Sequence, residues 1–305
     1  MSLTDAKDLA AVLLGSAVES AEEVSASAEH RVFRITLRDL TAFLKIATKA
    51  QLEPELAALQ LLGPTEVPVA SVLATDLDGS QTGIPCALLR HVGGIPLSYD
   101  SPLFASSGPL LRQVHEVSVD GYGHLSANSD TPRGQDRTWA DAIQLQIQGI
   151  EPVVAAGLVD ANLAARAVAE VTSRMPLLHP PEPGRLIHGD FHFRHVFADD
   201  IRVTGVIDWG DASSGDPLYD FGRILHSIVV VAGYDEAVRV VDKIRRSYGQ
   251  APWLHAGSAQ LMLVYAVAFI LEAMKSEHAG GSPWPPWWPA QIRALHAILE
   301  ALDGT

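Results

Sequence analysis

Hydrophobic residues recur along this chain with two different periods, and the change of period divides the sequence into two parts. Up to about residue 92, apolar and polar residues alternate as they do in strands; Phe33, Ile35 and Leu37, for example, fall on one face. Beyond Leu97, apolar residues recur at the three- and four-residue intervals of amphipathic helices. The pattern therefore predicts a small part built on a sheet, followed by a larger and mainly helical part.

The first part has enough alternating segments for five strands. We expect them near Glu19–Val24, Arg31–Leu37, Ala42–Ala47, Val67–Ala74 and Ile84–Val92. A helix through Leu14 precedes these strands, and a second helix, Gln51–Leu62, is expected between the third and the fourth because its leucines recur at helical spacing.

The second part is predicted to be helical except around one polar stretch and one Pro-rich break. The expected helices are Leu103–Val117, Trp139–Gly149, Ala161–Met175, Phe221–Ala232, Glu236–Tyr248, Ser258–His278 and Ala290–Leu302. Residues 120–137, rich in Gly, Ser, Asp and Pro, are predicted to form a surface loop. Pro180 to Gly184 then ends a helix and leads into a stretch of different composition.

That stretch, Leu186 to Ile224, holds the densest group of ionisable residues in an apolar neighbourhood. Its ionisable residues include His188, Asp190, His192, His195, Asp208, Asp211, Asp216 and Asp220. Asp199-Asp200 is a turn-forming pair between two strand-like segments, so a hairpin is expected there.

Folding the chain back at this turn returns Asp208 to the neighbourhood of His195 and Asp190. Two carboxylates that face each other repel unless a positive charge lies between them or one of them binds a proton. A divalent cation that also binds a phosphate satisfies that requirement. The hairpin therefore predicts a cation and phosphate site.

At these residues the chain resembles the aminoglycoside phosphotransferase and choline kinase family, relatives of the protein kinases. The family pattern is His-Gly-Asp with an Asn after four further residues, then Ile-Asp-Trp-Glu or similar, Gly-Asp-Pro, and Tyr-Asp-Leu or similar. The matching segments here are His188-Gly189-Asp190, Ile207-Asp208-Trp209-Gly210, Gly215-Asp216-Pro217 and Tyr219-Asp220-Phe221. One position differs, because His195 stands where the family has Asn.

The resemblance implies an α+β fold of two lobes like that of protein kinases. A nucleotide-binding lobe of residues 1–92 would hold a five-stranded antiparallel sheet. A mainly helical lobe of residues 93–305 would carry the catalytic hairpin and bind the acceptor. The resemblance also implies that Asp190 is the catalytic base and that Asp208 is the principal ligand of Mg²⁺. His188 and Asp220 are interpreted as structural residues that hold the catalytic turn.

Three roles are open for His195. In the first, His195 ligates a softer metal such as Mn²⁺. In the second, it contacts a phosphate as imidazolium. In the third, the second metal site of the family is weak or missing. Imidazole is a poorer ligand for Mg²⁺ than an oxygen donor, which makes the substitution relevant to the choice of metal.

Lys45 lies within an apolar strand, where an ammonium group costs free energy unless it binds an anion. By the resemblance, Glu55 on the following helix pairs with Lys45, which positions the phosphates of ATP or GTP; Glu53 is the nearby alternative. A lysine on an edge strand with its ammonium group in solvent is the other interpretation.

Two further segments complete the expected nucleotide site. Ser27 lies in a short loop of small residues where relatives cover the ATP phosphates, although this loop has no glycine. Residues Arg90, His91 and Val92 resemble the crossover between the lobes, whose main chain would bind adenine, and Gly93-Gly94 is consistent with a hinge there.

The charge and length of the chain restrict its partners. The 305 residues carry a formal net charge of −14, which argues against nucleic acid and anionic membranes as partners and suits a cationic acceptor. Many proteins are acidic only for solubility, so the charge is weak support for an aminoglycoside.

Location is inferred from cysteine use and from the apolar runs. Cys86 is the only cysteine, and the N-terminal segment lacks the pattern of a secretory signal, so a cytoplasmic location is expected. The longest unbroken apolar run, Leu261 to Leu271, is shorter than the roughly 20 residues that span a bilayer.

The expected activity is transfer of the γ-phosphoryl group of ATP or GTP, with Mg²⁺ or Mn²⁺, to a hydroxyl of a small molecule. The acceptor would be an antibiotic of the aminoglycoside or macrolide type or another small metabolite. The tryptophans at Trp284, Trp287 and Trp288 either stack on such an acceptor or bury apolar surface between helices.

Two alternatives remain open. The first is a catalytically weak relative that binds nucleotide or another ligand, because His195 replaces the family Asn. The second is a metal-dependent phosphohydrolase, because Gly189-Asp190-Phe191-His192 is similar to the Gly-Asp-x-His of metallophosphoesterases. No separate Asp-x-His or Gly-Asn-His motif occurs in the chain to support the second.

Overall fold

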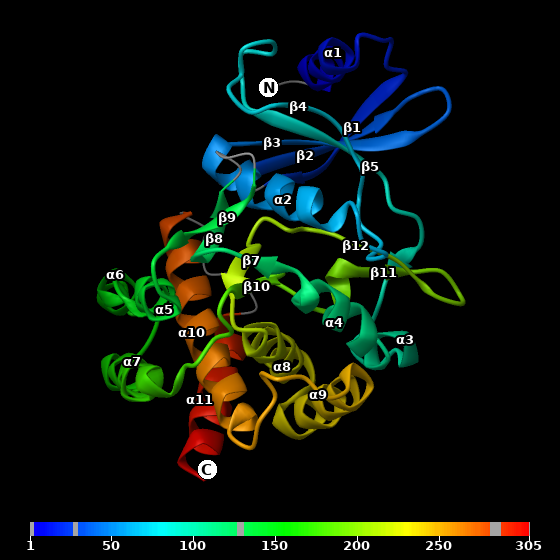
Figure 1. The fold of residues 1–305 in the computed structure, drawn as a ribbon. Helices are drawn as coiled ribbons and strands as arrows, with labels where there is room; N and C mark the ends of the chain where they lie inside the picture. The colour runs from blue at the N-terminus through cyan, green and yellow to red at the C-terminus, as the bar shows by residue number, and fades with distance from the viewer. Residues whose placement is uncertain (1–2, 27–29, 127–130, 281–287, 305) are drawn as a thin grey trace.

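The alternation seen in the first part of the sequence corresponds to one antiparallel sheet in the upper lobe of the molecule (Figure 1). The computed structural model describes residues 3–26, 30–126, 131–280 and 288–304. The sheet has the strand order β1-β2-β3-β5-β4, and every neighbouring pair is antiparallel. Its strands are β1 (Ser20–Ala26), β2 (His30–Thr36), β3 (Thr41–Ala47), β4 (Val72–Asp76) and β5 (Cys86–Arg90).

The two faces of this sheet have different coverings. On one face, Phe33 and Ile35 of β2 are buried in a core with Ala6 and Ala10 of α1 (Leu3–Leu14), as their alternation predicts. Helix α2 (Lys49–Leu62) lies on the side that faces the lower lobe (Figure 1). Because Leu59 of α2 packs in the main core of the lower lobe, the two lobes share one continuous hydrophobic contact.

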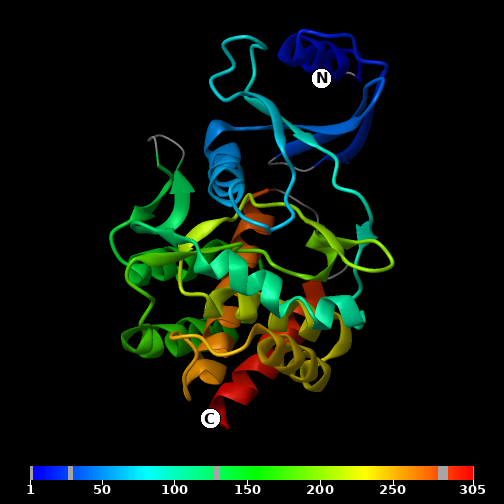
Figure 2. The ribbon, with the colours of Figure 1, turned by 45° about the vertical axis from the view of Figure 1, so that its right-hand side comes forward.

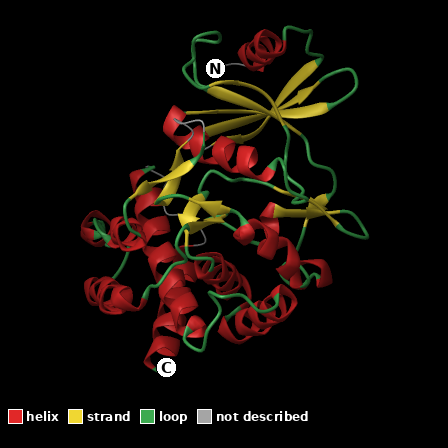
Figure 3. Ribbon diagram, viewed as in Figure 1, coloured by secondary structure: helices red, strands yellow, loops and turns green. Residues whose placement is uncertain are grey.

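The lower lobe is mainly helical, with two small sheets near its top (Figure 3). Its helices are α3 (Pro102–Ala105), α4 (Gly108–Glu116), α5 (Trp139–Ile147), α6 (Glu151–Ala155), α7 (Ala161–Arg174), α8 (Leu218–Ala232), α9 (Tyr234–Tyr248), α10 (Ser258–Ala279) and α11 (Trp288–Asp303), with 3₁₀ turns η1 (Met175–Leu177) and η2 (Phe193–His195).

The small sheets position residues Leu186 to Ile224, the stretch that is predicted to be catalytic (the catalytic stretch). One sheet has the order β7-β10-β13-β8-β9 and the other β12-β11-β6. Their strands are β6 (Ile95–Pro96), β7 (Ser118–Val119), β8 (Tyr122–Ser126), β9 (Arg133–Asp136), β10 (Gly184–Ile187), β11 (Val196–Ala198), β12 (Val203–Val206) and β13 (Ser213–Gly215). The catalytic stretch thus leaves β10, passes through the β11–β12 hairpin and enters α8 through β13.

The predicted hairpin at Asp199-Asp200 is present, and its turn is closed by one side chain. Asp199 Oδ1 accepts hydrogen bonds from the backbone N–H groups of Ile201 and Arg202, both at 2.8 Å. Strands β11 and β12 pair antiparallel on either side of it. The prediction of a β-hairpin in this stretch is therefore confirmed.

Helix α10 is long and apolar enough to cross a membrane by length and composition alone. In the structure, 67% of its most apolar window is buried within the protein. Figure 2 shows α10, in orange, passing through the middle of the lower lobe among the other helices. Its hydropathy is therefore that of a core helix.

Several predicted boundaries are wrong. Residues 120–137 are not a plain surface loop, because β8 and β9 form there and β8 pairs with β13 beside the catalytic stretch. The strand expected at Val67–Ala74 forms only as Val72–Asp76, and the helix expected at Leu103–Val117 is interrupted at Ser106-Ser107. In each case tertiary contacts decide what the local pattern leaves open; Val69, for example, makes an isolated bridge to Val206 instead of joining β4.

Candidate active site

The turn that carries Asp190 is held from below by Asp220 of α8. Asp220 Oδ2 accepts from the backbone N–H of His188, and its Oδ1 accepts from that of Gly189, both at 2.9 Å. Gly189 has φ +80°, and a Cβ there would lie 2.1 Å from the carbonyl oxygen of Asp211. Only glycine fits this turn, and the prediction that Asp220 anchors it is confirmed.

Asp220 has a further partner that lies outside the catalytic stretch. His115 Nε2 of α4 is 3.0 Å from Asp220 Oδ2, and its Nδ1 is 3.0 Å from the Tyr248 hydroxyl of α9. The side chains of His115 and Asp220 are fully buried. Three helices therefore contribute to one buried network beneath the catalytic turn, which stabilises its position.

His188 is a structural residue, as predicted. Its Nδ1 accepts from the backbone N–H of Asp190 at 3.2 Å, so Nε2 carries the proton and donates to the Ile207 carbonyl at 3.0 Å. Burial lowers the pKa of His188, and the ring is therefore neutral. It links the turn at Asp190 to the end of β12.

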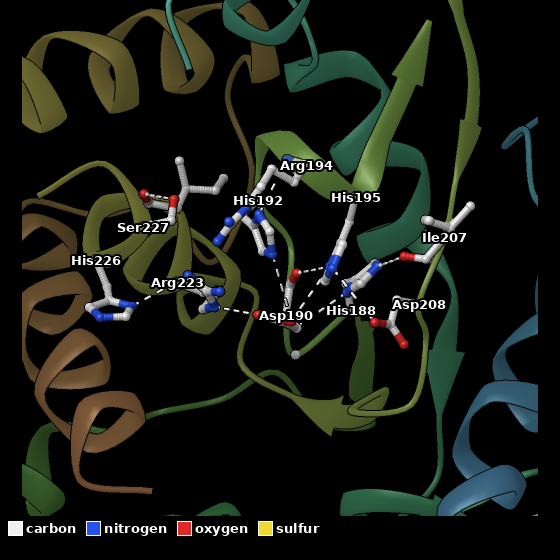
Figure 4. A network of polar contacts seen from close by, with 12 residues as sticks. His188, Asp190, His192, Arg194, His195, Ile207, Asp208, Arg223, His226 and Ser227 are labelled. Carbon is white, nitrogen blue, oxygen red and sulfur yellow. Dashed lines mark hydrogen bonds and ion pairs between the residues drawn. The ribbon is translucent and has the colours of Figure 1, made fainter. Parts of the chain in front are cut away.

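The hairpin brings Asp190, His195 and Asp208 together, as the sequence predicts (Figure 4). His195 Nδ1 is 3.5 Å from Asp190 Oδ2, and its Nε2 is 3.6 Å from Asp208 Oδ2. Asp208 has φ +63°, the one positive φ of a residue other than glycine among the residues that the structure describes. This left-handed backbone costs free energy and occurs where the chain leaves β12 and its carboxylate meets Lys45.

Lys45 of β3 forms two ion pairs, one within the upper lobe and one with the lower lobe. Its Nζ is 2.9 Å from Glu55 Oε2 of α2 and 3.2 Å from Asp208 Oδ1. Burial alone would lower the pKa of Lys45, but the two carboxylates outweigh it and the pKa is raised. Lys45 is thus a buried ammonium with anionic partners, and the interpretation as a surface lysine is wrong.

Glu53, the alternative partner for Lys45, is excluded by its position. Glu53 Oε1 lies 3.8 Å from Lys49 Nζ, on the same helix. Glu55 is therefore the partner of Lys45, as predicted. For Asp208, burial opposes ionisation, but nearby positive charge, that of Lys45 above all, more than compensates and holds its pKa well below the usual value.

A cavity of about 490 Å³ lies between the lobes next to these charges. It is bordered by Arg90, His91 and Val92 of the crossover, by Phe43 and Lys45 of β3, and by Asp208. The crossover residues predicted to contact a nucleotide therefore line this cavity. Ser27 lies outside the described residues, although the neighbouring Ser25 lines the cavity.

The donor atoms around Asp208 fit a divalent cation. His195 Nδ1 is 3.0 Å from the backbone carbonyl of Asp190, and since a carbonyl only accepts, Nδ1 donates. In the neutral ring Nε2 then keeps a lone pair, and this lone pair faces the Asp208 carboxylate. A histidine ligand whose other nitrogen donates to a backbone carbonyl is the usual arrangement at metal sites.

His192 is close to this group but is not arranged to ligate. With Asp190 and His195 it forms the cluster of potential ligands found among the described residues. Its Nδ1 accepts from the Arg194 backbone N–H at 3.2 Å, so in the neutral ring Nε2 carries the proton. Burial, with the nearby positive charge of Arg223, lowers the pKa of His192. The ring therefore offers Asp190 a donor and offers a metal no lone pair.

Gly189 of the catalytic turn also lines a second, smaller cavity of about 190 Å³. Its polar lining includes His124 of β8, Gln146 of α5, Asp211, Tyr219 of α8 and Glu272 of α10. Gln146 Oε1 is buried and has no hydrogen-bond partner among the described residues. The lining is therefore rich in acceptors, and a ligand with several N–H donors would satisfy it.

Asp211 is a site residue that sequence reasoning noted without a role. It reaches solvent at the edge of the small cavity, and the protein atoms packed around it, with the charges of Asp190 and Asp208, raise its pKa to about 7. A cation bound in the cavity would relieve this repulsion.

Arg223 of α8 is a site residue that sequence reasoning missed. Its Nε donates to Asp190 Oδ1, and the pair is largely buried. The available signal was a lone arginine in the apolar helix that follows Asp220, because a buried guanidinium requires an anion.

Of the two roles expected for the tryptophans, stacking on an acceptor or burial between helices, the structure decides for one residue. Trp288 is buried at the start of α11, and its Nε1 donates to the Leu158 carbonyl at 2.7 Å. It packs between helices, as the structural interpretation expected. Trp284 and Trp287 lie outside the described residues.

Comparison with known proteins relates the chain to phosphotransferases. A sequence model of the phosphotransferase enzyme family matches residues 20–256. Hygromycin-B 4-O-kinase of Escherichia coli is 32% identical over 76 residues, which are 25% of this chain and 22% of that protein. The uncharacterized protein YcbJ of Bacillus subtilis (strain 168) is 28% identical over 123 residues, 39% of this chain and 34% of that protein. These alignments span about a fifth and a third of the two relatives.

Solved structures are similar over nearly the whole chain. A thermostable mutant of aminoglycoside phosphotransferase APH(4)-Ia, in a ternary complex with AMP-PNP and hygromycin B, has a TM-score of 0.73 at 21% identity and covers 99% of this chain and 100% of its own. Spectinomycin phosphotransferase APH(9)-Ia, in complex with ADP and spectinomycin, has a TM-score of 0.66 at 13% identity and covers 100% of this chain and 99% of its own. The predicted two-lobed, kinase-like α+β fold is confirmed.

Proposed function

The chain belongs to the phosphotransferase enzyme family, and we propose that it transfers the γ-phosphoryl group of ATP or GTP to a hydroxyl of a small molecule. The observation that carries this proposal is the convergence of Lys45, Asp208 and Asp190, which come from β3, the end of β12 and the loop after β10. Lys45 and Asp208 line the large cavity, and Asp190 directly follows Gly189, which lines the small one, so the charges required for phosphoryl transfer lie at both cavities.

In the proposed site the nucleotide occupies the large cavity. Lys45, held by Glu55, positions the phosphates, and main-chain groups of Arg90, His91 and Val92 bind the base. The nucleotide site then lies between an N-terminal lobe of residues 1–92 and a C-terminal lobe of residues 93–305.

We assign the cation to Asp208 and His195, whose facing lone pairs fit it. A cation held by these two residues would neutralise charge on the phosphates of the nucleotide. A carboxylate suits Mg²⁺, whereas the imidazole nitrogen of His195 suits Mn²⁺ and other first-row transition ions. Of the three roles open for His195, this geometry supports ligation of a metal.

Asp190 is the proposed base. Its Oδ1 is held by Arg223, and its Oδ2 lies beyond hydrogen-bond distance from His192 Nε2, at 3.8 Å, and His195 Nδ1, at 3.5 Å. Oδ2 is therefore free to accept the proton of the acceptor hydroxyl as its oxygen attacks the γ-phosphorus and the nucleoside diphosphate leaves.

The acceptor is proposed to be an amine-bearing antibiotic or a similar small cation. Asp211, Glu272 and the unpartnered Gln146 Oε1 line the small cavity beside Asp190. Glu272 already pairs with Lys275 at 2.7 Å, so Asp211 is the carboxylate with the greater need of a cation. Hygromycin B, the ligand of a structural relative, is a suitable first acceptor to assay.

The two alternatives have less support from the structure. A phosphohydrolase site would need His192 as a ligand, and its Nε2 carries the proton. A weak or inactive relative would follow from the loss of the family Asn, but His195 presents a lone pair to Asp208 in its place. With one buried free cysteine, a cytoplasmic location is proposed as well.

The experiment that tests the proposal combines nucleotide binding and turnover. Melting temperature is measured with ATP, GTP and ADP, each with Mg²⁺, Mn²⁺ or EDTA, and ADP or GDP release is measured with hygromycin B, other aminoglycosides and macrolides. Metal-dependent stabilisation by a nucleoside triphosphate and acceptor-dependent release are expected.

The variant Asp190→Asn should lose about 10² to 10⁴ in kcat while it keeps nucleotide binding. Asp200→Asn, on the exposed hairpin turn, serves as the control and should behave like the wild type. Stabilisation by metal alone, with no effect of any nucleotide, would refute the kinase and favour the hydrolase.

A further inference from the structure

The proposed base Asp190 is held by a cation from the lower lobe. Arg223 Nε donates to Asp190 Oδ1, with side-chain exposures of 9% for Arg223 and 19% for Asp190 (Figure 4). Two further titratable side chains near Asp190, His192 and His195, lie 3.8 and 3.5 Å from Oδ2. Among these groups Arg223 alone makes a hydrogen bond to the carboxylate.

Arg223 is itself held from its other side by His226, one turn along α8. Arg223 Nη1 is 3.3 Å from His226 Nδ1, and since a guanidinium only donates, Nδ1 accepts. Burial, together with the charge of Arg223, lowers the pKa of His226 to about 3, so the ring is neutral and Nε2 carries its proton. His226 Nε2 then donates to Gln291 Oε1 of α11 at 2.5 Å.

The hydrogen bonds that link Asp190, Arg223, His226 and Gln291 have a consistent assignment of donors and acceptors. Arg223 donates both to Asp190 and to His226, and His226 donates to Gln291. Residues Arg223, His226 and Gln291 are all buried. Each hydrogen bond thus fixes the tautomer or the orientation of the next group, which a chain of solvated side chains would not do.

Packing also restricts the guanidinium. Its Cζ lies 4.3 Å from the centroid of the Phe269 ring of α10, and the His226 ring lies 5.1 Å from the same centroid. A cation over an aromatic face is stabilised most when desolvated. Arg223 is therefore confined by side chains of α8 and α10 to the position in which it meets Asp190, and α11 contributes through His226.

We propose that Arg223 is the positioning residue for Asp190, and that His226 and Gln291 connect this pair to the C-terminal helix α11. The proposal rests on the proposed function, because it assigns the orientation of the base in that reaction. By holding Oδ1, Arg223 leaves Oδ2 toward the acceptor hydroxyl. Because the carboxylate is already oriented, no free energy is needed to orient it during the reaction. Misplacement of such a group by about 1 Å can lower the rate about 10²-fold.

Three variants and one control test the assignment. Arg223→Met removes the charge and the donors and keeps the length. Arg223→Lys keeps the charge and loses the forked donors. Gln291→Leu removes the acceptor of the last hydrogen bond in the series, the one from His226. Arg174→Met is the control, because Arg174 also forms a partly buried ion pair, with Glu170 of α7, within its own helix and away from the catalytic stretch.

The expected signature is a loss of kcat without loss of nucleotide binding. Arg223→Met should lower kcat about 10- to 100-fold, while KM for the nucleotide and its melting shift stay within about twofold. Arg223→Lys should recover part of the loss, and Gln291→Leu should show a smaller one. The control Arg174→Met should keep the wild-type kcat. A normal kcat in Arg223→Met would overturn the proposal.

Failure of this inference and failure of the proposed function give different results. Full turnover in Asp190→Asn would refute the base itself, whereas loss in Asp190→Asn with none in Arg223→Met would refute only the positioning role. If no acceptor gives turnover, arginine ¹⁵N–¹H spectra test the pair directly. A slowly exchanging Arg223 Nε–H signal that shifts in Asp190→Asn is expected, and exchange as fast as in exposed arginines would contradict the pair.

Discussion

The atom that faces Asp208 distinguishes this chain from the pattern of its family. The family Asn would present an amide group there, whereas His195 presents a ring nitrogen 3.6 Å from Asp208 Oδ2. Its orientation is set by the bond from Nδ1 to the Asp190 carbonyl, so the ring cannot turn away without losing that bond. If His195 is a ligand, as we propose, this one substitution changes the donor set from oxygen alone to nitrogen and oxygen, and the preference for metal ions should change with it.

We expect His195→Asn to shift the metal preference from Mn²⁺ toward Mg²⁺. The ratio of kcat/KM with Mn²⁺ to that with Mg²⁺ should fall roughly tenfold or more, in keeping with the usual effect of altering a metal site. Steady-state rates at matched free metal concentrations measure it. His296→Asn, an exposed histidine on α11, should leave the ratio unchanged. An unchanged ratio in His195→Asn would show that the imidazole is not a ligand.

At the scale of elements, the turn between β4 and β5 is organised by one carboxylate. Asp76 Oδ1 accepts from the Ser80 N–H at 3.0 Å, and Oδ2 accepts from the N–H groups of Gln81 and Thr82 at 2.9 and 2.8 Å. The Thr82 hydroxyl also donates to Oδ2, at 2.8 Å. Desolvation alone would raise the pKa of Asp76, but these donors outweigh it and lower the pKa to about 2.

This pKa predicts the acid stability of the small lobe. The folded value of about 2 lies below the unfolded value of about 3.9. Asp76 therefore stabilises the fold fully above about pH 5, and the contribution is lost as the pH falls from about 5 to about 2. Asp76→Asn should lower the melting temperature at pH 7 and flatten its decline across that window. Asp78→Asn, an exposed neighbour, is the control. Equal slopes for Asp76→Asn and the wild type would refute the role.

The hairpin that carries the proposed site residues was predicted correctly, whereas the elements that pack against it were not. Asp190, Asp208 and His195 were brought together by the expected hairpin, because its turn chemistry is local. The β8–β9 hairpin was missed, because Gly and polar residues dominate its sequence and its pairing partner β13 is about 90 residues away. Arg223 was missed for a similar reason, since its partner comes from another element.

At the scale of the whole molecule, the net charge of −14 acts on any charged substrate. Such a field attracts a cationic acceptor and opposes a nucleoside triphosphate, and salt screens both effects, with a Debye length of about 8 Å at physiological ionic strength. Asp211 adds a local contribution at the small cavity.

For an aminoglycoside acceptor we therefore expect KM to rise as the salt concentration increases from about 0.05 to about 0.5 M. KM for the nucleotide should not rise in the same way. Asp211→Asn should raise KM for the aminoglycoside at low salt and reduce its dependence on salt. A KM that is independent of salt in the wild type would mean that charge does not select the acceptor.

The sequence by itself determined the two periodicities, the hairpin, the need of Lys45 for an anionic partner and the family resemblance of the stretch from His188 to Asp220. These depend on local chemistry, since apolar spacing, turn residues and a charge in an apolar strand restrict the chain within a few residues. The tertiary structure alone decided that Arg223 holds Asp190, that Asp211 lies in a second cavity and that His195 turns Nε2 toward Asp208. Those facts depend on which distant elements meet and on which hydrogen bond fixes each side chain. The local order of hydrophobic and polar residues determines neither.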